Sequence, residues 1–380
     1  MCAIALSDCV LRVYTGRPGA LEGLRNHRIR RRSHDPVFRI TTALVVAALL
    51  AVAAPIGRRN PETSRAFAAQ IAALSEPDGY FDTDNLISNE TAYLHVVPDL
   101  ERRRVRGGAY IGVGPDQNFS YIAGVRPSIA YIVDIRRDNL LLHLLFKALF
   151  EQAQTRIEYL ALLLGRAVPP DAAKWRDLPI DQLAQYLERP ALDTASLDVI
   201  SQRLERIMRG FGVPLSSQDL ATIRAFHRKF VQDGLLLRFQ TTGRLPQSYY
   251  PTYGELLRGT DAAGRQRNYL AAEESFQYIK SMQARDRVIP VIGDLSGSKA
   301  LAGIARVLAA EKAPLSAFYA SNVEFYLERS GSYPRFLANL ARLPHAEEAV
   351  VIRSVFNRGM GGSTSEVERI DELLAQPAGR

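Results

Sequence analysis

The stretch YIGVGPDQNFSYIAGVRPSIAYIVDIRRD, from Tyr110 to Asp138, decides the fold class. It contains an apolar run, a glycine turn, a segment of helix length and a second apolar run that ends in an acid. This order is typical of a βαβ unit that holds an adenosine-bearing cofactor. Gly112 and Gly114 lack a Cβ, so the backbone can turn sharply and approach a ligand closely. Asp134 lies twenty residues after Gly114, the offset at which an acid reaches a ribose hydroxyl.

The pattern continues on the C-terminal side of this unit. Residues 138–152 (DNLLLHLLFKALFEQ) are apolar nearly all round and predict a buried helix. Strands that alternate with helices imply right-handed crossovers and a parallel sheet covered on both faces. We therefore predict an α/β fold with a doubly wound, mostly parallel sheet. The other predicted elements are strands at 288–292, 315–320 and 349–356, and helices at 298–312, 333–343 and 365–374.

The stretch from Gly165 to Asp286 has a helical pattern that prolines interrupt, and near its end lies the loop LPQSYYPTYGELL. We interpret it as a helical insertion. The predicted organisation has four parts. They are a basic N-terminus at 1–39, expected to be disordered, an apolar segment at 40–56, a Rossmann-like α/β domain at 57–164 and 286–380, and the insertion at 165–285.

The apolar segment from Ile40 to Ile56, ITTALVVAALLAVAAPI, is 17 residues long, carries no charge and follows a cluster of arginines. Its length and basic flank fit the apolar region of a signal peptide or a marginal membrane span. The expectation is a protein that is anchored to the membrane through this segment, or exported. The alternative is a buried alanine-rich helix in a cytoplasmic protein.

Composition limits the chemistry of the remaining chain. The chain has 380 residues, is 47% hydrophobic and carries a formal charge of +8, but eight arginines lie within residues 1–39. The body has no basic and aromatic stripe, so nucleic-acid binding is not indicated. Both cysteines, Cys2 and Cys9, precede the apolar segment, which excludes a disulfide framework, a zinc–thiolate site and a cysteine nucleophile from the body. The six histidines are scattered, and no metal site is predicted.

The glycine turn, the acid that ends the second strand and the βα units that follow resemble the class I S-adenosylmethionine-dependent methyltransferase fold. The resemblance covers about residues 105–156 and 286–357. In that family the glycine turn packs on the methionine moiety and the acid binds both ribose hydroxyls, roles that the resemblance assigns to Gly112, Gly114 and Asp134. Asn118 and Phe119 stand where the family has a third small residue. The resemblance implies S-adenosylmethionine as cofactor.

Two further strand ends are predicted to line the same crevice, because ligands of open α/β sheets bind at the carboxyl ends of strands. In the methyltransferase resemblance, Asp294 takes the place of the acid that contacts the adenine amino group. Ser321 and Asn322 end the following strand. We expect Gly112, Asp134, Asp294 and Asn322 to lie within one ligand's length. The candidate cofactor contacts are Gly112, Gly114, Asp116, Asn118, Asp134, Arg136, Asp294, Ser321 and Asn322.

Each of these features also has a simpler interpretation. The glycines are equally the tight turns that any α/β sheet needs, and the run Arg136–Asp138 is equally a solvated group of charges. Asn89 and Glu90 are expected to fold over the cofactor or to form a turn. The glycines at 359–362 indicate either the hinge of a lid or a mobile tail. The stretches FDTDNLISNETAYLHV (81–96) and GVGPDQNF (112–119) are also similar to an uncharacterised bacterial family.

The segment GDLSGSK, from Gly293 to Lys299, is similar to a phosphate loop. Ser298 stands where that loop has a glycine and Ala300 where it has the magnesium-binding hydroxyl, which argues against ATP hydrolysis. The backbone amides remain able to bind an anion. The alternative is that Ser296 or Ser298 caps the helix that follows.

Two functions from different classes follow. The leading hypothesis is a methyltransferase-like protein that binds S-adenosylmethionine at the 110–138 unit, with an unknown substrate. Methyl transfer needs mainly positioning, so the lack of a histidine or cysteine is no objection. The alternative is a non-catalytic binding module, tethered to the membrane or exported, that keeps the fold without the chemistry. The oligomeric state is not predicted.

Overall fold

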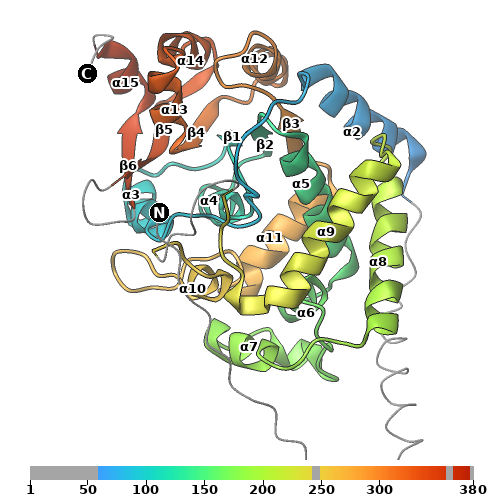
Figure 1. Ribbon diagram of the computed structural model, residues 1–380. Helices are drawn as coiled ribbons and strands as arrows, with labels where there is room; N and C mark the ends of the chain where they lie inside the picture. Colours follow the sequence, from blue (N-terminus) through green and yellow to red (C-terminus); the bar gives the residue numbers. More distant parts are fainter. Residues whose placement is uncertain (1–58, 242–248, 357–362, 377–380) are drawn as a thin grey trace, which may run out of the picture. The chain divides into compact units, whose positions relative to one another are not determined.

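The computed structural model describes residues 59–241, 249–356 and 363–376. The predicted basic N-terminus, the apolar segment 40–56 and the glycines at 359–362 lie outside these residues. Six strands form one sheet (Figure 1). They are β1 (Ala109–Gly112), β2 (Ile129–Asp134), β3 (Val288–Ile292), β4 (Leu315–Ser321), β5 (His345–Phe356) and β6 (Ser363–Arg369).

The strand order in the sheet is β3-β2-β1-β4-β5-β6. The first five strands are parallel, which confirms the mostly parallel α/β sheet. Gly112 at the end of β1 pairs with Ile132 of β2 and with Tyr319 of β4, so these strands end close to one level. Successive strands are added on one side of β1 as far as β3 and on its other side from β4 onward, so the direction of the strand order reverses between β1 and β4. In open α/β sheets such a reversal opens a crevice at the carboxyl ends of the strands.

The C-terminal helix predicted at 365–374 is wrong over its first half. Residues 363–369 form β6, which pairs antiparallel with β5, and only Ile370–Ala375 are helical, as α15. Ser363 and Ser365 are buried, whereas Thr364 and Glu366 are exposed. This alternation has the period of a strand with one buried face. The side chains of Ser363 and Ser365 therefore face the interior.

Fourteen α-helices of the described residues surround the sheet. Contacts place α2, α12 and α14 together, and α4, α5 and α11 together, the two sets that Figure 1 shows on opposite faces of the sheet. The helices are α2 (Pro61–Leu74), α3 (Val97–Arg102), α4 (Gln117–Val125), α5 (Arg137–Gln152), α6 (Arg156–Leu163), α7 (Ile180–Leu187), α8 (Thr194–Arg209), α9 (Ser217–Asp233), α10 (Tyr253–Leu257), α11 (Glu273–Ala284), α12 (Ala300–Glu311), α13 (Val323–Arg329), α14 (Tyr333–Leu340) and α15. Short 3₁₀ turns occur at Tyr93–Val96, Ala172–Trp175 and Gly234–Leu236.

The predicted βαβ unit is confirmed as β1, α4 and β2. Every residue of β1 is buried, as are the first five residues of β2. The predicted helix after it is confirmed as α5, which is buried on nearly all sides. One side of α5 packs on β2 and β3, while α8 and α9 cover the other. The helix is apolar on nearly every face because it is covered on nearly every face.

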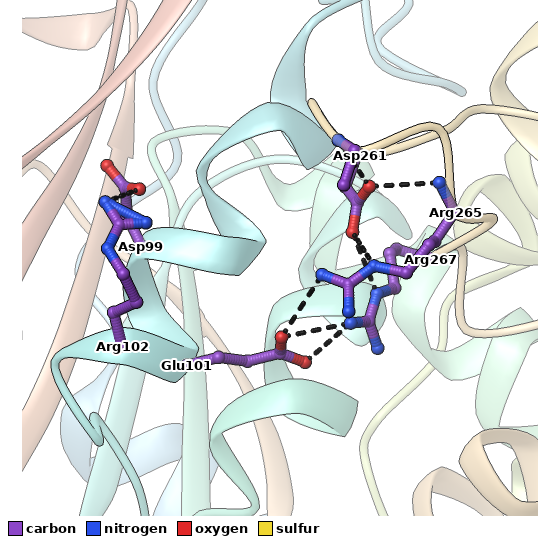
Figure 2. A network of polar contacts seen from close by, with 7 residues as sticks. Asp99, Glu101, Arg102, Asp261, Arg265 and Arg267 are labelled. Carbon is purple, nitrogen blue, oxygen red and sulfur yellow. Dashed lines mark hydrogen bonds and ion pairs between the residues drawn. The ribbon is translucent and has the colours of Figure 1, made fainter.

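The predicted insertion, residues 165–285, is helical and shares one continuous hydrophobic core with the sheet. Its last helix, α11, packs against α4 and α5 immediately before β3. An ion-pair network also fastens the end of the insertion to α3 (Figure 2). The buried Asp261 accepts from Nε of Arg265 at 2.9 Å and from Nε of Arg267 at 3.1 Å, and both guanidinium groups also reach Glu101. Although burial opposes it, these donors and the backbone amides of Arg265 and Ala263 lower the pKa of Asp261 to about 2.

None of the described helices combines the length and the apolar character that crossing a bilayer requires. That finding does not extend to the predicted segment 40–56, because this segment lies outside the described residues.

Candidate functional site

A pocket of about 550 Å³ lies at the carboxyl ends of four neighbouring strands. This is the position at which parallel sheets with a reversal of strand order bind their ligands. Its size falls within the range of small-molecule sites. The predicted residues that line it are Gly114 after β1, Asp134 and Arg136 at the end of β2, Asp294 after β3, and Ser321 and Asn322 at the end of β4.

Three segments outside the sheet enclose the pocket and contribute most of its aromatic surface. They are the loop 81–89, the insertion around residues 239 and 249–250, and α13. The rings of Phe81 and Tyr326 meet edge to face with centroids 4.9 Å apart, which joins the first segment to the third. The aromatic residues of the lining are Phe81, Phe239, Tyr249, Tyr250, Phe325 and Tyr326.

Asp134, the predicted ribose ligand, forms a bidentate ion pair with Arg136. Oδ1 accepts from Nε at 3.0 Å and from the backbone N–H of Arg136 at 2.9 Å, and Oδ2 accepts from Nη2 at 2.9 Å. Nη1 of Arg136 donates to the carbonyl of Thr83 at 2.8 Å. The interpretation of Arg136 as part of a solvated charge run is therefore wrong, because its side chain is only 7% exposed. The pair fixes the loop 81–89 against the end of β2.

Gly112 and Asn118 belong to the internal structure of the turn and do not line the pocket, which corrects the prediction that Gly112 shares the crevice. A Cβ on Gly112 would lie 1.9 Å from Oδ1 of Asn118. Asn118 is fully buried, accepts from the hydroxyl of Tyr110 at 2.8 Å, and donates to the carbonyls of Val113 and Pro115 at 2.8 Å each. The missing Cβ thus makes room for the asparagine that stands in place of a third small residue. This asparagine holds the turn from inside.

Gly114 has the positive φ of 84° that the turn requires, and it does line the pocket. Its carbonyl is 2.9 Å from Nε2 of His143, a buried residue of α5. Burial lowers the pKa of His143 to about 4, so the ring is neutral at pH 7 and must carry its proton on Nε2 to donate to this carbonyl. Both ends of the turn are therefore braced by side chains of the protein itself.

Asp116 points away from the pocket, toward the insertion. Its carboxyl accepts from the hydroxyl of Tyr269, which lies in the short loop before α11, at 3.1 Å. Burial raises the pKa of Asp116 to about 7, and the hydrogen bond from Tyr269 only partly opposes this. The predicted cofactor contact at Asp116 is therefore replaced by a contact between the glycine turn and the insertion.

Glu90 is buried beside the pocket and does not line it. It is 1% exposed, and its carboxylate accepts from the hydroxyl of Tyr319 at 2.9 Å and from the hydroxyl of Ser321. Its neighbour Asn89 does line the pocket. The expectation that both residues fold over a cofactor is thus wrong for Glu90, whose side chain is hydrogen-bonded to Tyr319 and Ser321 of β4.

Two polar residues of the lining were not singled out from the sequence. Thr83 and Gln117 are both buried, and both line the pocket. Oγ1 of Thr83 and Oε1 of Gln117 have no hydrogen-bond partner among the described residues. Buried polar atoms without a partner are costly, and at a pocket they mark where a ligand can supply one. A lone threonine or glutamine has no sequence signature, and only the fold brings these two to one place.

The segment from Gly293 to Lys299 encloses a carboxylate of the protein. Glu76, which follows α2, accepts from the backbone N–H of Asp294 at 3.1 Å, of Lys299 at 3.0 Å and of Ala300 at 2.9 Å. The predicted cap by Ser296 or Ser298 is wrong, because no side chain of this segment caps α12 and Glu76 satisfies its first amides. The predicted ability to bind an anion is used within the chain.

A family model described as "Domain of unknown function (DUF7790)" matches residues 86–169 and 246–374, more than half of the chain. These residues include all six strands and most of the pocket. The stretch between them, 170–245, holds α7, α8 and α9 of the insertion. No curated protein was found to match the chain.

Replacing Glu76 by alanine is expected to lower the free energy of unfolding by about 1–3 kcal/mol, because three backbone amides at the start of α12 lose their acceptor. Urea unfolding followed by circular dichroism measures the change. Glu62→Ala, an exposed substitution on α2, is the control and should stay within about 0.5 kcal/mol of the wild type. Equal stability of Glu76→Ala and the wild type would show that the carboxylate is not a structural acceptor.

The raised pKa of Asp116 predicts a pH-dependent stability difference. The protonated carboxyl is preferred in the folded state, so its contribution is complete below 3.8, the ordinary pKa of an aspartate, and is lost as the pH rises through about 7. Asp116→Asn removes this titration. The unfolding free energy of the wild type relative to Asp116→Asn should therefore fall by a few kcal/mol between pH 4 and pH 8, since one pKa unit corresponds to about 1.4 kcal/mol. Parallel stability curves for the two proteins would contradict the assignment.

Proposed function

The chain belongs to the DUF7790 family, and we propose that it binds an adenosine-bearing small molecule, with S-adenosylmethionine as the first candidate. The proposed site is the pocket at the carboxyl ends of β1 to β4. The observation that carries the proposal is the lining of this pocket. It combines an acid at the end of β2, Asp134, with polar atoms of Thr83 and Gln117 that have no partner within residues 59–241, 249–356 and 363–376.

The surroundings of the pocket favour a ligand without phosphate groups. The amides at the start of α12 are already occupied by Glu76, so a phosphate there would have to displace a carboxylate. At the start of α4, Pro115 has no N–H that could donate to a phosphate. A nucleoside linked to an amino acid meets neither obstacle, whereas a dinucleotide with its pyrophosphate meets both.

The contact of Asp134 with a ribose is limited by its ion pair. A carboxylate offers about four lone-pair positions, and Arg136 occupies three of them. One position on Oδ2 remains, enough for one ribose hydroxyl. The aromatic rings of the covering segments supply flat apolar surface for the adenine base. The bound ligand would thus rest its base on the covering segments and its ribose on the end of β2.

If the protein transfers a methyl group, its contribution is to hold the sulfonium and the acceptor in line and to exclude water. The second candidate is a binding module without catalysis. The Asp134–Arg136 pair favours the binding module. An acid that binds both hydroxyls of a ribose needs free acceptor positions, and Arg136 occupies most of those on Asp134. Formation of S-adenosylhomocysteine from S-adenosylmethionine in the presence of a cell extract separates the two candidates.

Isothermal titration of the full-length chain should show binding of S-adenosylmethionine and S-adenosylhomocysteine, and at least about tenfold weaker binding of ADP, a difference of about 1.4 kcal/mol. Thr83→Val keeps the shape of the side chain and removes its hydroxyl. It should weaken binding by about 0.5–1.5 kcal/mol, the usual contribution of one hydrogen bond.

Thr222→Val, on α9 and outside the pocket, is the matched control and should bind like the wild type. If neither adenosine compound gives heat or a thermal shift, the proposed ligand is wrong. If they bind equally well to Thr83→Val and to the wild type, the identity of the ligand is supported but its predicted contact with Thr83 is wrong.

A further inference from the structure

Glu90 is a buried acid to which the described part of the chain supplies no cationic side chain. Burial raises the pKa of its carboxyl, and only hydroxyl groups act in the opposite direction; no lysine, arginine or histidine of the described residues contributes. Because this side chain is only 1% exposed, burial disfavours its ionised form. A cationic group bound in the adjacent pocket would favour the ionised carboxylate.

The carboxylate of Glu90 also decides which way Gln117 faces. Tyr319 donates its only hydroxyl hydrogen to Oε2 of Glu90 at 2.9 Å. The tyrosine oxygen can then only accept, and it accepts from Nε2 of Gln117 at 3.3 Å. The amide is therefore oriented with Oε1 away from Tyr319, and this oxygen is the buried atom without a partner among the described residues. Because Gln117 lines the pocket, its side-chain oxygen is an acceptor for which a ligand can supply the donor.

Ser321 is oriented in the same way by the other carboxylate oxygen of Glu90. Its hydroxyl donates to Oε1, so toward the pocket the serine oxygen can only accept. Ser321 has a φ of 53°, in the left-handed region that favours glycine. A serine held there meets a backbone cost that its hydrogen bond to Glu90 helps to offset. Both Ser321 and Gln117 thus act as acceptors because of one carboxylate.

We infer that Gln117 and Ser321, polarised by Glu90, form a subsite for a primary ammonium group of the ligand. An ammonium carries three N–H donors and a positive charge, which match two acceptors that face the pocket and the buried carboxylate behind them. A carboxylate, a phosphate or a carbonyl of the ligand would meet only acceptors here. The inference rests on the proposed function, because the probe molecule is an adenosine compound. It adds to that function the chemical group that Gln117 and Ser321 select.

The test uses two ligands that differ by one amino group. S-adenosylhomocysteine carries the ammonium, and 5′-S-(3-carboxypropyl)-5′-thioadenosine is the same molecule without it. Calorimetry with the full-length chain should show that the wild type prefers S-adenosylhomocysteine by tenfold or more. Gln117→Met, which keeps the length of the side chain and removes the acceptor, should reduce that preference to less than threefold while binding of the deaminated ligand changes by less than twofold. Glu90→Gln, whose side chain cannot ionise, should reduce the preference in the same way.

The matched control is Gln70→Met. Gln70 on α2 also donates to a tyrosine hydroxyl, that of Tyr131 at 3.2 Å, but lies outside the pocket. It should leave both affinities unchanged. If both ligands bind the wild type equally well, or if Gln117→Met weakens both alike, the ammonium subsite is refuted while the adenosine site stands. If neither ligand binds the wild type, the proposed function fails and the subsite fails with it.

Discussion

Parallel pairing brings the carboxyl ends of β3, β2, β1 and β4 to one edge of the sheet, and the strand order reverses between the last two. Backbone hydrogen bonding enforces this arrangement, so the residues that immediately follow these strands meet at one crevice. The pocket, the Asp134–Arg136 pair and the turn at Gly114 all depend on it. The helices and loops outside the sheet then determine how much of the crevice stays open to a ligand.

Many hydrogen-bonding groups at this edge of the sheet are occupied by other groups of the protein. The carboxylate of Glu76 fills the amides at the start of α12, Arg136 occupies most of Asp134, and Asn118 and His143 hold the glycine turn. Three residues of the lining keep acceptor capacity: Oγ1 of Thr83 and Oε1 of Gln117 have no partner among the described residues, and Ser321 keeps free lone pairs. A ligand thus meets these acceptors beside aromatic surface. These groups restrict the possible ligands more than the fold alone does.

The sequence predicted the elements that depend on local pattern and missed the contacts that depend on the fold. The βαβ unit and α5 follow from apolar runs, glycines and helical period, and these are properties of short windows. Glu76 is separated from the amides that it caps by more than two hundred residues, and Glu90 is as far from Ser321. No spacing rule connects them. Ser363 to Arg369 was misjudged for a related reason: its two-residue alternation becomes decisive only when β5 is beside it.

The most direct test of the account is a crystal structure of the full-length chain with S-adenosylhomocysteine. The account predicts the ligand in the pocket at the carboxyl ends of β1 to β4. A ribose hydroxyl should lie within hydrogen-bond distance of Oδ2 of Asp134, and the amino group between Oε1 of Gln117 and the hydroxyl oxygen of Ser321. A ligand bound elsewhere, or bound in this pocket with its amino group turned away from Gln117 and its carboxylate in that place, would contradict it.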